Sequence, residues 1–267
     1  MTAGAVVFVL VILTGAVVEL RARAGDRDEA AAGTATTSGG TPVAGRSPAP
    51  TTVPPTSTTV QPRPRPEPRN LTVGSRGRDV RALQTSLIRL AYADLARATG
   101  TFDEQTRHAV VSFQKVNGLD RDGIAGPRTL AALRAPRVPR PRDPGRDFHV
   151  ETDLDRQVTY LVSGGRVSAI IDASTASGRT YEVDGDLRLA VTPTGEFRIQ
   201  RRLDGWRRSD LGLLYRPAYF VGGYAYHGAP SVPPFPASHG CIRMTLSTMD
   251  RFSDRFAVGT RVLVYRT

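Results

Sequence analysis

Hydrophobic residues change their spacing several times along the chain, and each change marks a different kind of segment. Residues 3–18 are an apolar run without charged side chains, slightly shorter than the roughly 20 residues that cross a bilayer as a helix. Residues 25–69 are rich in Thr, Ser and Pro and have no hydrophobic period, so they cannot bury a core that offsets their ordering entropy. The pattern predicts a membrane anchor or signal segment over 1–24, with a buried core helix as a further alternative, and a disordered linker over 25–69.

Helical periodicity dominates residues 70–135. Apolar positions recur there at spacings of three and four, which gives each helix one apolar face; the first two stripes are Val80, Leu83, Leu87 and Leu90, and Ala109, Val110, Phe113 and Val116. Asp103 is the expected N-cap and Gly118 the expected end of the second helix, and Pro127 opens a short third one. The pattern predicts a small three-helix domain, with His108 facing solvent, whose size favours binding over catalysis.

Beyond a second, Pro/Arg-rich linker at 136–146, the period changes to two over residues 147–267. Short alternating runs separated by Gly, Ser and Asp predict strands at 157–161, 167–171, 187–191, 197–199, 219–221, 224–226 and 261–265. One helix is predicted at 246–256. The predicted fold class is therefore multidomain: a small all-α three-helix domain followed by a mainly-β domain of sandwich-like or barrel-like architecture.

The charge balance excludes one class of partner. The chain has 36 Lys and Arg against 25 Asp and Glu, a formal net charge of +11. This excess is spread thinly, without a basic stripe or a nucleic-acid-binding motif. Nucleic acid is therefore not an expected partner, whereas an acidic extracellular polymer is compatible with the charge.

The strongest chemical feature is Cys241, the only cysteine in the sequence. A thiol reacts as its thiolate, and an ordinary cysteine is mostly protonated at neutral pH. A base is therefore needed, and both His227 and His239 closely precede the thiol. Gly228 and Gly240 let the backbone pass near a bound acyl group, and the backbone N–H groups around Gly240 and Cys241 are candidate oxyanion donors. The pattern favours a reactive thiol over a buried, inert one.

A metal site is the alternative for the same side chains, because His227, His239 and Cys241 are possible zinc ligands. A zinc hydrolase also needs a general base, usually a carboxylate. The sequence has no Asp or Glu between Asp210 and Asp250 and no HExxH motif. Neither a metal nor another cofactor is therefore expected.

Several positions in residues 70–135 fit one known pattern: Gly74, Gly77, Val80, Leu83, Gln84, Leu87, Gly100, Thr101, Phe102, Asp103, Thr106, Ala109, Val110, Phe113, Gln114, Gly118, Leu119, Asp122, Gly123, Ile124, Gly126, Thr129 and Leu130. Together they resemble the peptidoglycan-binding domain type 1 family. The connection at 91–100 is longer than usual in that family. The resemblance implies non-catalytic attachment to cell-wall glycan or peptide, with a structural spacer as the alternative.

A second set of motifs lies in residues 147–267: Thr192-Pro193-Thr194-Gly195-Glu196-Phe197, His227-Gly228 and Ser238-His239-Gly240-Cys241-Ile242-Arg243-Met244. They resemble the L,D-transpeptidase catalytic (YkuD-type) family. The resemblance implies that Cys241 is the nucleophile and that His227 is a general base that later acts as an acid. It further assigns His239 and Gly240 to the pocket and oxyanion site and, for substrate binding, Arg243 at a carboxylate, Ser238 and Gly228. The loop at 228–237 is shorter than in many relatives and contains four prolines, which predicts a stiff lid.

The resemblance implies acyl transfer in two steps. The thiol attacks the carbonyl of the third residue of a tetrapeptide stem and expels D-alanine, and an amine of a neighbouring stem then takes the acyl group to make a 3–3 cross-link. L,D-carboxypeptidase or other hydrolytic activity and a non-catalytic wall-binding protein are the alternatives. The expected partners are peptidoglycan and, through residues 1–24, the membrane. The expected location is a single-pass cell-membrane protein with its catalytic domain outside, or a secreted protein if residues 1–24 are cleaved.

Overall fold

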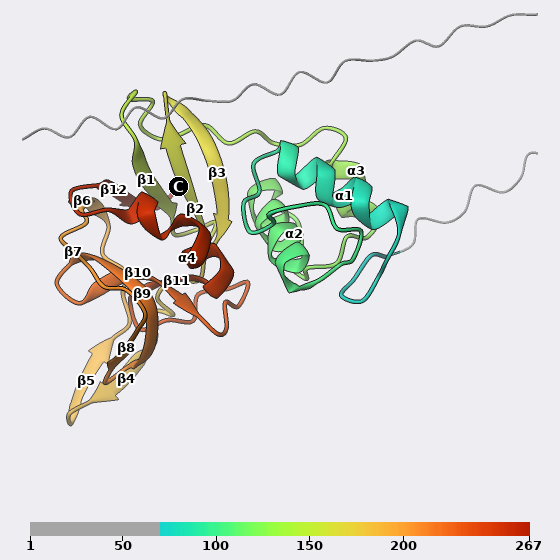
Figure 1. The fold of residues 1–267 in the computed structure, drawn as a ribbon. Coiled ribbons are helices and arrows are strands. Elements are labelled where there is room, and N and C mark those ends of the chain that lie inside the picture. Colours follow the sequence, from blue (N-terminus) through green and yellow to red (C-terminus); the bar gives the residue numbers. More distant parts are fainter. Residues whose placement is uncertain (1–69) are drawn as a thin grey trace, which may run out of the picture. The chain divides into compact units, whose positions relative to one another are not determined.

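The computed structural model describes residues 70–267 (Figure 1). The predicted anchor at 1–24 and the predicted linker at 25–69 lie outside these residues. Among the described residues no helix is long and apolar enough to cross a membrane; the longest, α2, has 14 residues, whereas a spanning helix needs about 20. The expectation of a single-pass membrane protein with the membrane as a partner is therefore corrected: no element within 70–267 supports it.

Helices occupy the segment before the strands: α1 (Arg78–Arg89), α2 (Glu104–Asn117) and α3 (Pro127–Ala132). The predicted ends are confirmed. The Asp103 carboxylate caps α2 by accepting a hydrogen bond from the backbone N–H of Thr106 at 2.8 Å. Gly118 ends α2 at φ 69°, a left-handed conformation that glycine adopts without strain. Pro127 is the first residue of α3, where its missing N–H costs nothing.

The following part of the described chain is mainly β. One sheet has the strand order β3-β2-β1-β12-β6, in which β1 and β12 run parallel. Its strands are β1 (His149–Asp153), β2 (Val158–Ser163), β3 (Arg166–Asp172), β6 (Gly195–Arg198) and β12 (Arg261–Tyr265). A separate hairpin pairs β4 (Thr180–Val183) with β5 (Asp186–Leu189).

The second sheet has the order β11-β10-β9-β7, and β8 also pairs with β9. Its strands are β7 (Arg201–Arg202), β8 (Trp206–Ser209), β9 (Gly212–Val221), β10 (Tyr224–Ala229) and β11 (Ile242–Thr245). After β11 the chain forms the helix α4 (Leu246–Phe252) and the 3₁₀ helix η1 (Ser253–Phe256), in the region where the sequence predicts one helix.

The main hydrophobic core lies between the two sheets. The first sheet contributes Val150, Leu161, Ile171 and Val262; the second contributes Ala218, Phe220, Tyr226, Ile242 and Met244; α4 and η1 contribute Met249 and Phe256. Alternate residues of each strand point to this core. The mainly-β architecture predicted for residues 147–267 is confirmed, and it consists of two packed sheets.

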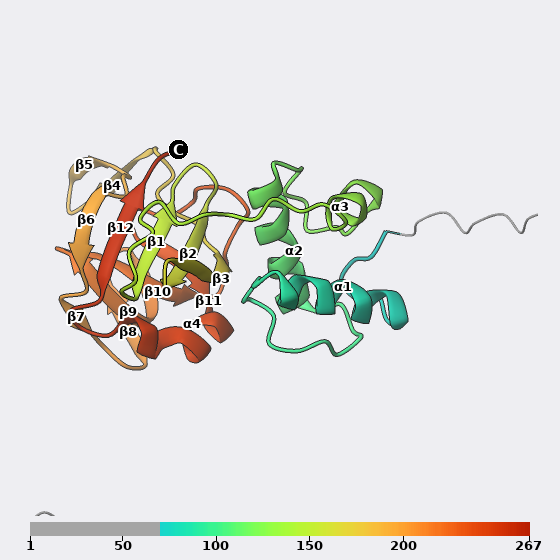
Figure 2. The same ribbon diagram turned by 90° about the horizontal axis from the view of Figure 1, so that it is seen from above.

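The helical segment packs against the outer face of β2 and β3, at one side of the first sheet. Leu161 belongs to the core between the sheets, whereas its neighbours Tyr160 and Val162 share a second core with Phe113 and other apolar residues of the helical segment. Figure 2 shows α2 beside β2 and β3. The helical segment and the β domain therefore have a common core, and residues 136–146 are not their only connection.

A buried polar network crosses the same junction. Lys115 on α2 and Asp172 at the end of β3 form an ion pair at 2.5 Å, and neither side chain is exposed. The Lys115 ammonium also donates to the carbonyl oxygens of Gln157 at 3.0 Å and Ala173 at 2.8 Å. The second Asp172 carboxylate oxygen lies 2.6 Å from Nδ1 of His108. The prediction that His108 faces solvent is wrong, because this face of α2 packs against the sheet and leaves the side chain buried.

Asp94, in the connection between α1 and α2, extends this network to α4. Its Oδ2 accepts hydrogen bonds from the backbone N–H of Asp172 at 2.8 Å and from the Ser112 hydroxyl at 2.9 Å. Its Oδ1 accepts one from the Thr248 hydroxyl at 2.9 Å. Thr248 belongs to the first turn of α4. The Asp94 carboxylate therefore joins the helical segment to the end of β3 and to α4.

Candidate active site

Two neighbouring parallel strands place the thiol and the upstream histidine. The register of β10 and β11 sets His227 opposite Arg243, and Tyr226 opposite Ile242. Tyr226 and Ile242 point into the core between the sheets. Side chains alternate along a strand, so His227 and Arg243 lie on the opposite face, as does Cys241, which directly precedes β11. The structure thus brings the predicted nucleophile, base and arginine onto one face of the second sheet.

The His227 ring has one nitrogen engaged and one free. Its Nδ1 lies 2.9 Å from the carbonyl oxygen of Gly228; a carbonyl only accepts, so Nδ1 carries the proton and Nε2 is the acceptor of the neutral ring. Burial lowers the pKa of His227 to about 4, since a charged ring is poorly solvated there. At neutral pH the side chain is therefore an uncharged imidazole with an open basic nitrogen.

The Cys241 thiol is partly exposed and weakly bonded. Its Sγ lies 3.7 Å from the carbonyl oxygen of Gly223, and the side chain packs against a small cluster of Leu214, Tyr219 and Ala225. Burial raises the pKa of the thiol; the Ala225 backbone N–H and the Arg243 charge act in the opposite direction but are smaller effects. The resting site therefore holds a neutral thiol and a neutral imidazole, and the thiol needs a base to become a nucleophile.

The loop that carries the thiol is held by Ser238. The Ser238 hydroxyl donates to the carbonyl oxygen of Cys241 at 2.6 Å and accepts from the backbone N–H of Gly240 at 3.1 Å. The backbone N–H groups of Ala237 and Ser238 both donate to the carbonyl oxygen of Thr175. Ser238 is 2% exposed. These contacts favour a positioning role for Ser238 over the substrate contact expected from the sequence.

The same hydrogen bonds narrow the choice of oxyanion donor. The sequence offers the N–H groups of Gly240 and Cys241, and the structure shows the Gly240 N–H occupied by Ser238. Of these two N–H groups, only that of Cys241 is not bonded to Ser238, so it is the better candidate for the oxyanion donor. Gly240 has a steric role instead, because a Cβ at this position would lie 2.4 Å from the Tyr224 ring and 3.1 Å from the Val191 carbonyl oxygen.

His239 faces a different neighbour from His227. Its ring centroid lies 4.6 Å from that of Tyr181, on the exposed β4–β5 hairpin, with the planes at 51°. The side chain therefore links the thiol loop to this hairpin. In the described range no three His, Cys, Asp or Glu side chains lie close enough together to hold a metal ion, so His227, His239 and Cys241 do not form the zinc site considered above.

Arg243 supplies positive charge beside the thiol. Its backbone N–H donates to the Ser174 carbonyl oxygen at 2.9 Å and its carbonyl oxygen accepts from the Ser174 N–H at 3.0 Å, which fixes its position on β11. Its guanidinium takes part in none of the ion pairs found within residues 70–267. The charge is therefore available for a substrate carboxylate.

Gly228 and the following loop are packed against the β domain. A Cβ at Gly228 would lie 3.0 Å from the Tyr215 ring and 3.2 Å from the Leu246 side chain, so this glycine provides space and the carbonyl that orients His227. The loop at 228–237 is bound at Phe235, whose carbonyl oxygen accepts from the Ser174 hydroxyl at 2.8 Å. At Gly228, as at Ser238, the geometry favours a positioning role.

One positioning residue was not identified as a site residue from the sequence. The buried Thr192 hydroxyl donates to the carbonyl oxygen of Gly240 at 2.7 Å and accepts from the backbone N–H of Ala176 at 3.0 Å. It thereby connects the thiol loop to residues 174–177. The available signal was its place at the start of the Thr192-Pro193-Thr194-Gly195-Glu196-Phe197 motif.

Comparisons with known proteins agree with this geometry. The peptidoglycan binding domain family matches residues 76–133, and the L,D-transpeptidase catalytic domain family matches residues 147–264. A probable N-acetylmuramoyl-L-alanine amidase from Bacillus licheniformis is 43% identical over 63 residues, which are 23% of this chain and 18% of that protein. The chain therefore spans less than a fifth of this curated relative, and the activity in its name belongs to that protein.

A solved structure gives a longer match. The crystal structure of the L,D-transpeptidase (residues 123–326) from Xylanimonas cellulosilytica is 44% identical, with a TM-score of 0.71, and the match covers 77% of this chain and 100% of that one. This coverage extends beyond the catalytic domain into the helical segment, so both parts of the described chain have a counterpart in that structure. By this similarity and by its catalytic-domain match, the chain belongs to the L,D-transpeptidase family.

Proposed function

We propose that this chain is a cysteine-dependent acyltransferase that forms 3–3 cross-links between the peptide stems of peptidoglycan. The observation that carries the proposal is the pairing on one sheet face of a protonated thiol, Cys241, with a neutral imidazole, His227, whose Nε2 is free. A thiol with a raised pKa needs such a base to attack a carbonyl. One family matched by the chain is described as a peptidoglycan binding domain and the other as an L,D-transpeptidase catalytic domain.

In the first step His227 Nε2 takes the thiol proton, and Cys241 Sγ forms a bond to the carbonyl carbon of the third residue of a tetrapeptide stem. The negative charge on the carbonyl oxygen is stabilised by the Cys241 N–H. The tetrahedral intermediate then breaks its C–N bond, and the leaving D-alanine amine takes the proton back from His227. The product is a thioester between Cys241 and the shortened stem.

In the second step the side-chain amine of a diamino acid on a neighbouring stem attacks the thioester. His227 removes a proton from this amine, the new C–N bond forms, and the Cys241 sulfur leaves and regains its proton. Arg243 binds a stem carboxylate in both steps, and His239 and Gly240 shape the wall of the pocket. Because the substrate is the cell wall, we place the protein's action outside the cytoplasm.

The helical segment has a non-catalytic role in this proposal. It supplies none of the groups on the thiol face, and its match to a peptidoglycan binding domain covers residues 76–133. Its common core with the β domain fixes the position of any wall polymer held there relative to the thiol. We therefore expect the segment to hold the wall while the β domain reacts with it.

Acylation by a carbapenem tests the nucleophile. The wild-type protein should gain the mass of one carbapenem, and the Cys241→Ala and Cys241→Ser variants should gain none, because the thioester requires the sulfur. The unfolding temperatures of the variants provide the control for correct folding. Intact acylation of a folded Cys241→Ala variant would refute the assignment.

Product analysis tests the reaction. Incubation of the protein with tetrapeptide-bearing muropeptides should give dimers joined by 3–3 cross-links, identified by mass spectrometry. The second candidate is L,D-carboxypeptidase activity, which is favoured by one observation, the partial exposure of Cys241 to solvent. Accumulation of tripeptide stems without dimers would select the carboxypeptidase.

A further inference from the structure

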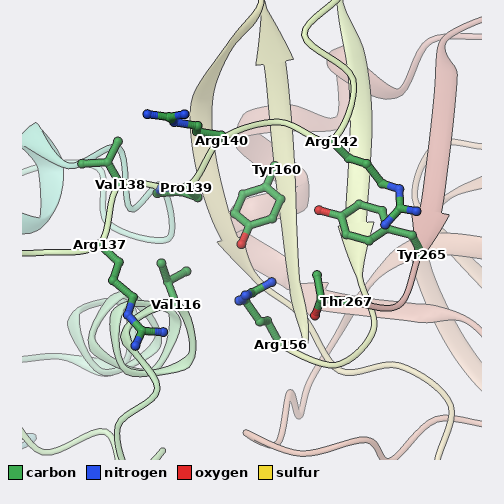
Figure 3. A pocket seen from close by; sticks show the side chains of 10 residues that line it. All are labelled: Val116, Arg137, Val138, Pro139, Arg140, Arg142, Arg156, Tyr160, Tyr265 and Thr267. Atoms are coloured by element: carbon green, nitrogen blue, oxygen red, sulfur yellow. The ribbon is translucent and has the colours of Figure 1, made fainter.

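The Pro/Arg-rich segment predicted as a linker forms one wall of a cavity of about 380 Å³ on the outer face of the first sheet (Figure 3). Ligand pockets in proteins commonly have volumes of roughly 300–1,000 Å³. The opposite wall is formed by Tyr160 of β2 and Tyr265 of β12, and the end by Val116 of α2. The candidate thiol site lies on the second sheet, so this cavity is separate from it.

The segment is fixed at both ends, to α2 at one and to the first sheet at the other. The backbone N–H of Arg137 donates to the Asn117 side-chain oxygen at 2.9 Å. The backbone N–H groups of Arg142 and Asp143 each donate at 2.8 Å to the carboxylate of Glu151, which is completely buried. Prolines between these points fix the backbone dihedral φ. The wall is therefore preformed, which lowers the entropy cost of binding.

The cavity has a positive lining. Four arginines contribute to it, Arg137, Arg140, Arg142 and Arg156, and none of its ten lining residues is acidic. Arg156 is engaged by Asp153 at 2.5 Å, and the Arg142 guanidinium lies over the Tyr265 ring, 4.9 Å from its centroid. The guanidinium groups of Arg137 and Arg140 have no ion-pair or hydrogen-bond partner within the described residues. Positive charge is thus left over for an anionic ligand.

Two tyrosine hydroxyls add unused donors. Tyr160 is 2% and Tyr265 is 8% exposed, and neither hydroxyl has a hydrogen-bond partner among residues 70–267. In Figure 3 the Tyr160 hydroxyl points toward Arg156 and the Tyr265 hydroxyl toward Tyr160. The buried side-chain polar atoms without a partner in residues 70–267 are Tyr92 Oη and Arg261 Nε, so the hydroxyls of Tyr160 and Tyr265 reach the open space of the cavity. Beside guanidinium groups without partners, they are donors available to a ligand that accepts hydrogen bonds.

We propose that this cavity is a second, non-catalytic binding site for a peptidoglycan peptide stem, which it holds through the stem's carboxylates. Arg137 and Arg140 pair with carboxylates, the hydroxyls of Tyr160 and Tyr265 donate to them, and Val116 and Val138 accommodate alanine methyl groups. The choice of a stem rests on the proposed function, since peptidoglycan is the polymer at the thiol. A stem combines carboxylates with small apolar side chains, as does the lining of this cavity.

Calorimetric titration of the full-length protein with a disaccharide tetrapeptide tests the proposal after the thiol has been acylated by a carbapenem. Acylation fills the catalytic site, so the remaining binding comes from this cavity and from the helical segment, which we also expect to hold the wall. The Arg137→Gln/Arg140→Gln variant should weaken the component that belongs to the cavity at least tenfold, and Tyr160→Phe severalfold, while the component of the helical segment is unchanged. The Arg89→Gln/Arg166→Gln variant, which removes the same charge from exposed positions elsewhere, should bind as the wild type does.

Three results would overturn the proposal: no stem binding to the acylated wild type, equal loss in the control variant, or tighter binding of glycerol phosphate than of the stem. A stem with amidated carboxylates should bind as weakly as the double variant. Unfolding temperatures confirm that each variant is folded. Failure of the wild type to be acylated would instead contradict the proposed function, so the two failures are distinguishable.

Discussion

Two groups of buried polar side chains in this chain differ in how completely their hydrogen bonds are used. At the junction of helices and sheet, the three protons of the Lys115 ammonium have three acceptors, on Asp172, Gln157 and Ala173. On the thiol face, His227 uses one ring nitrogen, and the Cys241 sulfur has one weak acceptor, the carbonyl oxygen of Gly223 at 3.7 Å. Saturated groups of the first kind stabilise a structure, whereas unsaturated groups of the second kind are available for chemistry.

The burial of the two groups has opposite consequences for the same reason. A low-dielectric environment disfavours charge. At the junction burial likewise lowers the pKa of Lys115, but the Asp172 carboxylate opposes this shift, so the two side chains stabilise each other. On the thiol face no partner compensates His227, so the ring loses its proton and becomes a base. The presence or absence of a buried counter-ion therefore separates the structural network from the candidate active site.

The largest expected effect is the loss of acylation rate when His227, with its free Nε2, is replaced. His227→Gln should lower the rate of acylation about 10²- to 10⁴-fold, the usual contribution of a positioned general base, because the thiol with its raised pKa would have no proton acceptor. Stopped-flow measurement with a chromogenic β-lactam reports the rate. His239→Gln is the matched control and should have a far smaller effect, since His239 packs on Tyr181. Equal losses in the two variants would contradict the assignment of the base.

The second largest expected effect is a loss of stability when the buried Lys115–Asp172 pair is broken. Lys115→Met leaves the Asp172 carboxylate buried without its counter-ion and should lower the free energy of unfolding by about 3–5 kcal/mol. Chemical denaturation measures this loss. The Lys115→Met/Asp172→Asn variant, which removes both charges, should recover part of it. A Lys115→Met protein of unchanged stability would show that the network does not hold the helices to the sheet.

The local features of this architecture could be predicted from the sequence. Asp103 and Gly118 act on their own helix, so capping residues were sufficient to place its ends. Alternation likewise identified most strands of the first sheet. It missed β1, His149–Asp153, whose residues are all buried and do not alternate, and β8, Trp206–Ser209, whose residues are all exposed. It also missed the short strands β4, β7 and β11. At the candidate site, the sequence predicts Cys241 and His227 as reacting groups, because both lie in short motifs that are close together in the chain.

The contacts between segments distant in the chain could not be predicted. Lys115 and Asp172 are separated by 57 positions, and nothing in the periodicity of α2 indicates that its polar face meets a strand end. For the same reason His108 was expected at the surface. The tautomer of His227 is set by the position of the Gly228 carbonyl oxygen, and the Gly240 N–H is occupied because of the position of the Ser238 hydroxyl. Residue types alone do not specify these positions.

The unpaired state of His227 also predicts a pH dependence of stability. Its pKa is about 4 in the folded protein and about 6.5 in an unfolded chain, where the ring is solvated. As the pH falls from 6.5 to 4 the unfolded state binds a proton that the folded state does not, so the folded state loses up to about 3 kcal/mol relative to it. The unfolding free energy of His227→Gln should lack this loss. The prediction would be contradicted if the unfolding free energies of the wild type and the variant differed by the same amount at pH 7 and at pH 4.5.

The smallest expected effect concerns the contact between His239 and the β4–β5 hairpin. Tyr181→Ala removes an aromatic pair worth about 0.5–1.5 kcal/mol and should weaken substrate binding a few-fold. The acylation rate at saturating substrate should be unchanged, because neither ring transfers a proton. Leu187→Ala on the same hairpin, where the side chain is 76% exposed, is the control. A Tyr181→Ala variant as slow at saturation as His227→Gln would place His239 among the reacting groups, and the distinction between one free and one packed histidine would then fail.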